Sequence, residues 1–211
     1  MADDRSFHKP VRRPAEEFDR LYAGDDPAEV SRAAHSTAGA ILARVRSDAS
    51  EEAVQRLIAH TRDHGIDTIA ELWSRSPAAT LPGALWRLYL LQLMIHDDAR
   101  TAAVLYERGR RAIASADDLV AGAPSPAGPR ELVELIDTIL RGAFTGDFAV
   151  ALERAAAFCR VQTAGAVDLA DDHEATEPDR ASVLTARALR LSKFADELTV
   201  CARLWRRDSL N

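Results

Sequence analysis

Hydrophobic residues recur at intervals of three and four along most of the chain, and no stretch of useful length alternates with a period of two. Such spacing is typical of amphipathic helices that bury one face. Capping residues, prolines and glycines divide the pattern into expected helices at 14–22, 27–46, 50–65, 67–73, 80–95, 99–114, 129–145, 148–170 and 178–205. We therefore predict an all-α fold, a helical bundle of about eight to nine helices.

The most apolar stretch is Thr80–Ile95, TLPGALWRLYLLQLMI. Thr80 is a candidate N-cap, and beyond the first turn Arg87 and Gln92 are the only strongly polar residues. A helix that is apolar nearly all round has neighbours on most sides, so we expect it to be the central buried helix. It is shorter than the roughly 20 apolar residues that cross a bilayer. Because residues 1–20 also lack an apolar signal segment, we expect a cytoplasmic protein that does not enter membranes.

The polar residues 1–13 show no periodicity and are expected to form a flexible tail, which leaves 14–211 as a single helical domain. Residues 115–128, SADDLVAGAPSPAG, are rich in helix-breaking Pro, Gly and Ser. This segment is therefore a candidate linker, and the domain can divide there into lobes at 14–114 and 129–211.

Two parts of the chain share short matches in the same order. Tyr22–Asp25 matches Phe144–Asp147, and Thr37–Ala40 matches Thr163–Ala166. A duplication predicts two pseudo-repeated helical halves around the central helix. The alternative is that a helical chain rich in Ala and Arg produces such matches by itself. The small side chains of 33–40, AAHSTAGA, also favour the close approach of a second helix.

The composition is that of an ordinary globular protein, with 47% hydrophobic and 28% charged residues. The formal net charge of −6 makes nucleic acid an unlikely partner, because phosphate binding depends on clustered Lys and Arg. Cys159 and Cys201 lie in apolar helical patterns and are read as buried reduced thiols, with a disulfide as the alternative.

Three acid–base residues form the candidate metal site. His60 and His64 are one helical turn apart, with Asp63 beside them, and side chains at this spacing share a helix face. The alternative is an ordinary helix end exposed to solvent. The acidic segments 96–98 and 171–174 each contain one His and could join these residues around a divalent metal, although acidic residues before a helix are also common caps.

Arg87 stands alone within the apolar stretch and needs a partner, because an unpaired buried charge is very costly. It is interpreted either as a structural ion pair or as an anion-binding residue between helices. The chain has no G-x-S-x-G, no paired CxxC, no P-loop and no G-x-G-x-x-G. Nucleophilic catalysis and phosphate binding by a glycine-rich loop are therefore not encoded by a recognised motif.

The last predicted helix carries a regular seam. Large apolar residues fall seven apart, at Leu184, Leu191, Leu198 and Trp205. Alanines follow the first three of them by four residues, as in helices that pair closely. This seam is a candidate interaction surface, and the alternative is packing within the core of the chain itself.

The segments ELWSRSPAATLPGALWRLYLL, GDFAVALERAAAFCRV and ELTVCARLWRRDSL together resemble a family of uncharacterised actinobacterial proteins of about this length. Some members carry an automatic label as an RNA polymerase β subunit. This chain is far too short for that subunit and has none of its catalytic motifs. The resemblance implies no catalytic residues.

From these features we expect a non-enzymatic cytoplasmic helical protein without a cofactor, acting through contact with a protein partner or as a homodimer. One alternative is a metal-dependent enzyme with a His/carboxylate site at His60 and His64. Another is a transcription-associated accessory factor, which the family label suggests.

Overall fold

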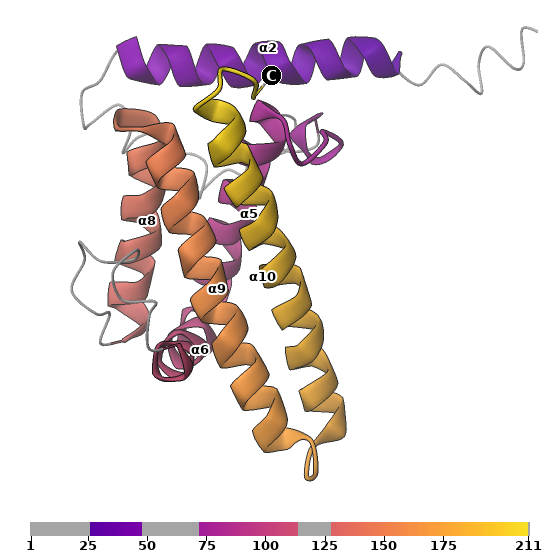
Figure 1. Cartoon of the computed structure of the whole chain (residues 1–211), viewed down its shortest axis with the longest axis vertical. Helices are drawn as coiled ribbons and strands as arrows, with labels where there is room; N and C mark the ends of the chain where they lie inside the picture. The colour runs from indigo at the N-terminus through magenta and orange to yellow at the C-terminus, as the bar shows by residue number, and fades with distance from the viewer. Residues whose placement is uncertain (1–25, 48–71, 114–127, 211) are drawn as a thin grey trace, which may run out of the picture.

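The computed structural model describes residues 26–47, 72–113 and 128–210, and within these ranges the chain is helical and contains no strand. The helices are α2 (Pro27–Ser47), α5 (Leu81–Asp97), α6 (Ala99–Ala112), α8 (Pro129–Thr145), α9 (Phe148–His173) and α10 (Pro178–Trp205) (Figure 1). The prediction of an all-α fold is confirmed. The helices expected at 14–22, 50–65 and most of 67–73, and nearly all of the candidate linker 115–128, lie outside the described residues.

The start signals read from the sequence act as predicted. The hydroxyl of Thr80 accepts a hydrogen bond from the backbone N–H of Gly83, at 3.2 Å, and so caps α5. Asp147 caps α9 by accepting from the backbone N–H of Ala149 at 2.8 Å. Prolines stand in the first turns of α8 and α10, where their missing N–H has no partner to lose.

One expected boundary is wrong. The acidic segment 171–177 was expected as a turn, but Asp171–His173 form the last turn of α9, and only 174–177 connect to α10. The helix continues because the buried residues Leu169 and Ala170 extend its apolar face by one more turn against α10. Burial of that face decides the helix end here rather than the local charge.

Two of the described helices, α5 and α9, have neighbours on most sides. In Figure 1, α9 and α10 form a long antiparallel hairpin, with α5, α6 and α8 packed against α9 and with α2 lying across one end. More than half of the 26 residues of α9 are buried, and it contacts α5, α6, α8 and α10. The expected central helix, α5, contacts each of the other described helices, and eight of its 17 residues are buried. In α9 the many alanines allow neighbours to approach from several sides.

Helices α6 and α9 cross in very close contact, where two glycines face each other's backbone. A Cβ added at Gly109 would lie 1.8 Å from the carbonyl oxygen of Val161, and one added at Gly165 would lie 1.8 Å from that of Leu105. The two backbones therefore touch, and any larger residue would separate them. Next to the crossing the rings of Tyr106 and Phe158 stack with their centroids 5.4 Å apart.

Helix α2 packs over the end of the bundle through small residues, as its composition suggests. Ala34 and Ala38 are buried, and the ring nitrogen of Trp73 donates to the hydroxyl of Thr37 at 3.1 Å. The guanidinium of Arg46 lies over the ring of Trp205, 5.4 Å from its centroid.

The internal repeat stays a prediction. Gly39 and Gly165 occupy matching positions in it, yet Gly39 has open space where its Cβ would be, whereas Gly165 is in backbone contact. Asp147 caps α9, and the residue that matches it in the repeat is Asp25. The whole matched segment Tyr22–Asp25 lies outside the described residues.

None of the helices in the described ranges combines the length and the apolar content that a membrane crossing requires.

Replacing Gly165 by Ala tests the crossing. The added Cβ must push α6 away from α9, so we expect a loss of about 2 kcal/mol or more in the free energy of unfolding, measured by urea denaturation. The matched control is Gly142→Ala in α8, where the nearest atom to a new Cβ is 3.9 Å away. Because Ala favours helix over Gly, the control is expected to be neutral or stabilising by up to about 1 kcal/mol. Equal stability of the two variants would contradict the contact.

Candidate functional site

The predicted metal residues His60, Asp63 and His64 lie outside the described residues. The prediction that the acidic segments 96–98 and 171–174 join these residues around a metal therefore stays a prediction. Asp98 is used as the N-cap of α6 and accepts from the backbone N–H of Thr101 at 3.1 Å. In the part of the chain that the structure describes, no group of three or more His, Cys, Asp or Glu side chains is placed to hold a metal ion.

A polar cluster that the sequence analysis missed joins α5 to α8. One carboxylate oxygen of Asp137 accepts from the amide of Gln92 at 2.9 Å and lies 2.9 Å from Nε2 of His96. Gln92 is buried and the other two side chains are largely covered. Sequence spacing gives no signal for this cluster, because Asp137 comes from a different helix. A carboxylate that holds an imidazole also occurs in acid–base sites, but here both neighbours of Asp137 come from α5, and their joint effect is to tie α5 to α8.

Arg87 has the structural ion pair that was one of its two interpretations. Its Nε donates to Glu197 of α10, and its Nη1 donates to the carbonyl of Gly83 at 2.9 Å. The two charged side chains are 14% and 17% exposed. Since Glu197 already balances the guanidinium, Arg87 is poorly suited to bind an anion.

Further charged residues bind α6 to the hairpin of α9 and α10. Nη1 of Arg108 lies 2.6 Å from a carboxylate oxygen of Asp172 and 2.8 Å from one of Asp168, and these hydrogen bonds raise the pKa of Arg108. Arg187 of α10 points toward Asp98 at a distance of 3.9 Å. Burial lowers the pKa of Arg187, and its Nε and Nη2 are buried without a hydrogen-bond partner.

The expected interaction surface at the α10 seam is wrong. Leu184, Leu191 and Leu198 are buried in the core of the chain itself, as are the alanines between them. Trp205 is partly buried against Phe148, with ring centroids 4.8 Å apart. The heptad spacing is real, but the partner of this seam is the chain's own bundle, chiefly α9. A partner protein has no access to these leucines.

Both cysteines are buried and unpaired with each other, as the first interpretation expected. Burial raises the pKa of Cys159 to about 12 and that of Cys201 to about 11. The thiol of Cys201 donates to the carbonyl of Ala78 at 3.2 Å. Because the thiolate is the nucleophile, neither cysteine is suited to nucleophilic chemistry near neutral pH.

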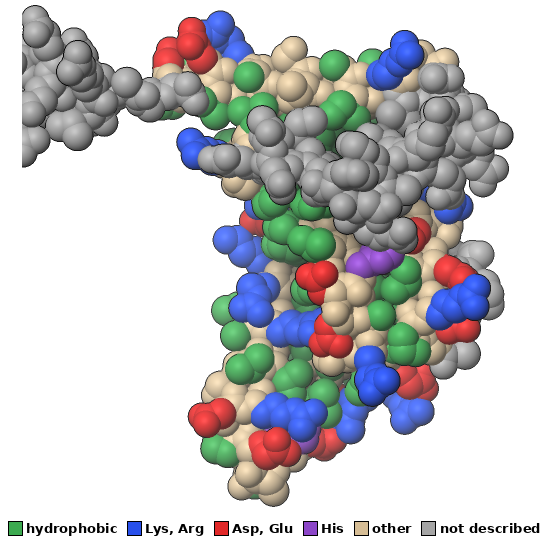
Figure 2. All heavy atoms as spheres, turned by 180° about the vertical axis from the view of Figure 1, so that it is seen from behind, with side chains coloured by type: hydrophobic (Ala, Val, Ile, Leu, Met, Phe, Trp, Pro, Cys, Tyr) green, Lys and Arg blue, Asp and Glu red, His purple; other side chains and the backbone are tan. Residues whose placement is uncertain are grey.

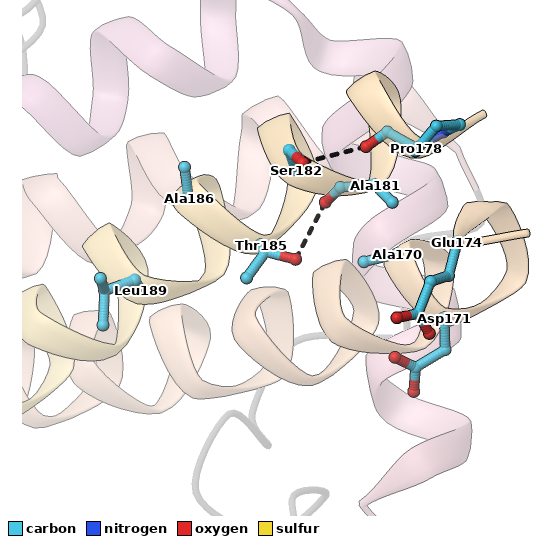
Figure 3. Close-up of a pocket in the computed structure, with 9 residues that line it drawn as sticks. All are labelled: Ala170, Asp171, Glu174, Pro178, Ala181, Ser182, Thr185, Ala186 and Leu189. Atoms are coloured by element: carbon cyan, nitrogen blue, oxygen red, sulfur yellow. Dashed lines mark hydrogen bonds between the residues drawn. The ribbon is translucent and has the colours of Figure 1, made fainter.

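The outer side of the α9–α10 hairpin carries a groove near the connection between the two helices (Figure 3). The groove has a volume of about 530 Å³, and most of its lining residues are small: Ala170, Asp171, Glu174, Pro178, Ala181, Ser182, Thr185, Ala186 and Leu189. In Figure 3, Leu189 lies at one end and the two acidic residues at the other.

The hydroxyls in this groove are turned to their own helix. Ser182 donates to the carbonyl of Pro178 at 3.0 Å, and Thr185 donates to that of Ala181 at 2.9 Å. The groove presents polar and apolar surface in similar amounts, with carboxylates at one end and Leu189 at the other.

Large aliphatic side chains extend this surface along the hairpin. Leu189 is 73% exposed, Val200 is 42% exposed, and Val167 of α9 is 46% exposed. Leu189 and Val200 are 11 residues apart, about three helical turns, so they lie on the same side of α10. We call this surface, with the groove, the outer face of the hairpin.

Figure 2 shows the molecule from behind. Hydrophobic, acidic and basic side chains are interspersed there, and neither charge forms a large continuous area among the described residues. These residues show no broad basic surface for nucleic acid on that side.

Comparisons with protein families, with curated proteins and with solved structures find no match for this chain.

The role of Arg87 is tested by replacing its partner. Glu197→Gln leaves a largely buried guanidinium without its carboxylate, and we expect the free energy of unfolding to fall by about 2–4 kcal/mol in urea denaturation. The matched control is Glu134→Gln, which breaks the exposed pair with Arg130 and should change stability by less than about 0.5 kcal/mol. If both variants are as stable as the parent, the pair does not hold α5 to α10.

Proposed function

We propose that this chain is a non-enzymatic cytoplasmic helical protein that acts through contact with another protein, and that the outer face of the hairpin is its contact surface. The observation that carries the proposal is the exposure of Leu189, at 73%, beside a groove lined mainly by small side chains. A partner that covers Leu189 and the groove beside it would remove apolar surface from water.

The shape of the groove favours a helix as the occupying element. Ala181 and Ala186 are small enough for a neighbouring backbone to come close, and the distance between packed helices depends on the side chains at their contact. Leu189 can then insert into the partner as an anchor. Contacts of this kind combine a central apolar residue with a surrounding polar rim.

The polar groups of the described residues support a structural role over catalysis. Arg87 is neutralised by Glu197, Asp137 is shared by Gln92 and His96, and both thiols have raised pKa values. Each of these groups joins two helices or is buried, so it does not face a substrate-sized groove. The groove on the outer face has two carboxylates, from Asp171 and Glu174, but its hydroxyls are engaged.

Two alternatives stay proposals. A metal-dependent enzyme would use His60 and His64 with Asp63, which lie outside the described residues. A transcription-associated accessory factor rests on the label carried by the similar family, and would bind a polymerase through a protein surface such as this one.

Site-specific photo-crosslinking in cells tests the contact surface. A photoreactive residue at Ala186, which lines the groove, is expected to form a covalent adduct with a protein on irradiation. The matched control is the same residue at Val104, which is exposed on α6, outside this groove. Adducts from Ala186 but not from Val104 support the proposal. Equal adduct yields, or none from either position, would contradict it.

Elemental analysis separates this proposal from the metal-dependent alternative. The protein is purified without chelators and without a metal affinity column, and we expect less than stoichiometric zinc, iron or manganese. Stoichiometric metal that is lost in His60→Ala but kept in His35→Ala, a change at a histidine of α2, would overturn the proposal in favour of the enzyme.

A further inference from the structure

We infer that the partner is a second copy of this chain, docked antiparallel on the outer face of the hairpin. This inference rests on the proposed function and names its partner. The arrangement is a two-fold dimer in which α9 and α10 of each copy contribute to a bundle of helices from both copies, with the axis near the middle of the hairpin.

The charge of the hairpin is strongly polarised along its length. Residues 166–182, which we call the tip, contain six acidic residues and one basic residue. Residues 148–165 and 183–207, which we call the shaft, contain eight basic and three acidic residues. A parallel dimer would place acidic tip against acidic tip. An antiparallel dimer places each tip on the shaft of the other copy, and its two ends are then complementary.

Part of the acidic charge at the tip remains available on the outer face. Arg108 of α6 pairs with Asp168 and Asp172, which therefore contribute less. Asp171 and Glu174 line the groove and are exposed.

The matching basic charge lies at the far end of α10. Arg203 and Arg207 are exposed there, and Arg203 follows Leu189 by 14 residues, about four helical turns, on the same side of the helix. Two-fold symmetry about a point near Ser192 brings this end of one copy beside the tip of the other. The acidic tip of each copy then faces the basic end of the other copy's hairpin, so the same pairing of opposite charges occurs at both ends of the interface.

The size of the face is that of a stable interface. With 26 and 28 residues, α9 and α10 are about 40 Å long, and two adjacent helices are about 20 Å wide. The face thus offers about 800 Å² per copy, the area of a typical specific interface. Each copy contributes Val167, Leu189 and Val200 as exposed apolar residues, so the contact combines apolar burial near the middle with charge pairs at the ends.

Charge reversal with rescue tests the arrangement. The tip variant is Asp171→Lys with Glu174→Lys, and the shaft variant is Arg203→Glu with Arg207→Glu. Each places like charges at both ends of the dimer, so we expect its dissociation constant, measured by sedimentation equilibrium, to rise at least about tenfold. The combined variant carries all four changes and restores opposite charges, so it is expected to dimerise nearly as well as the parent protein.

A control variant and a folding measurement accompany these experiments. Arg44→Glu reverses an exposed charge on α2, outside the hairpin, and should leave the dimer unchanged. Circular dichroism verifies that each variant is folded. Parent dimerisation should also weaken with salt, which screens exposed charges. A folded combined variant that stays as weak as the single reversals would overturn the antiparallel arrangement.

The inferred second copy can be wrong even if the proposed contact surface is right. If the purified parent protein is monomeric at micromolar concentrations and the Ala186 adduct in cells contains a different protein, the second copy is wrong and the contact surface stands. If the parent is monomeric and no adduct forms, both are wrong. A parent dimer with an adduct of two identical chains supports both.

Discussion

The arrangement of the described helices depends on the backbone contact between α6 and α9 at Gly109 and Gly165. Because no side chain separates the helices there, α6 crosses close to α9 and covers one side of it. The crossing places Arg108 within reach of Asp168 and Asp172. Beyond α6 the end of the hairpin extends past the rest of the bundle, as Figure 1 shows. The outer face of the hairpin is a consequence of this geometry.

Charged and polar residues in the interior fix the neighbours of α9 relative to one another. Glu197 holds α10 to α5 through Arg87, and Asp137 holds α8 to α5 through Gln92 and His96. Polar groups that bond across helices specify one arrangement of the helices, because any shift would leave a buried group unsatisfied. These polar groups of the described interior thus hold α5, α8 and α10 in place.

Much of the local structure could be predicted from the sequence. Caps and prolines mark where α2, α5, α8, α9 and α10 begin, because these signals act through backbone groups close in sequence. The relative positions of the helices could not be read in this way. Periodicity shows that Leu191 lies on an apolar face, but not that the partner of this face is α9 of the same chain.

The candidate site also depends on the relative positions of helices, which could not be read from the sequence. Leu189 and Asp171 are ordinary residues in the sequence, and they line one groove only because α9 and α10 pair antiparallel with a short connection. The cluster around Asp137 was missed for the same reason. Gly165 was noted only as part of a small-sided match, since the sequence does not say which glycine faces a neighbouring backbone and which, like Gly39, faces open space.

The most direct test of the central claim, the antiparallel contact of two hairpins, is a distance between identical positions in two copies, measured by pulsed electron paramagnetic resonance. Spin labels are attached to cysteines introduced at Lys193, near the proposed axis, or at Val183, near the tip; both sites are exposed. Ten residues of helix separate the sites, so the account predicts about 30 Å between the two Val183 labels and a clearly shorter distance between the two Lys193 labels. A shorter distance at Val183 than at Lys193, or no coupling at either site, would contradict it.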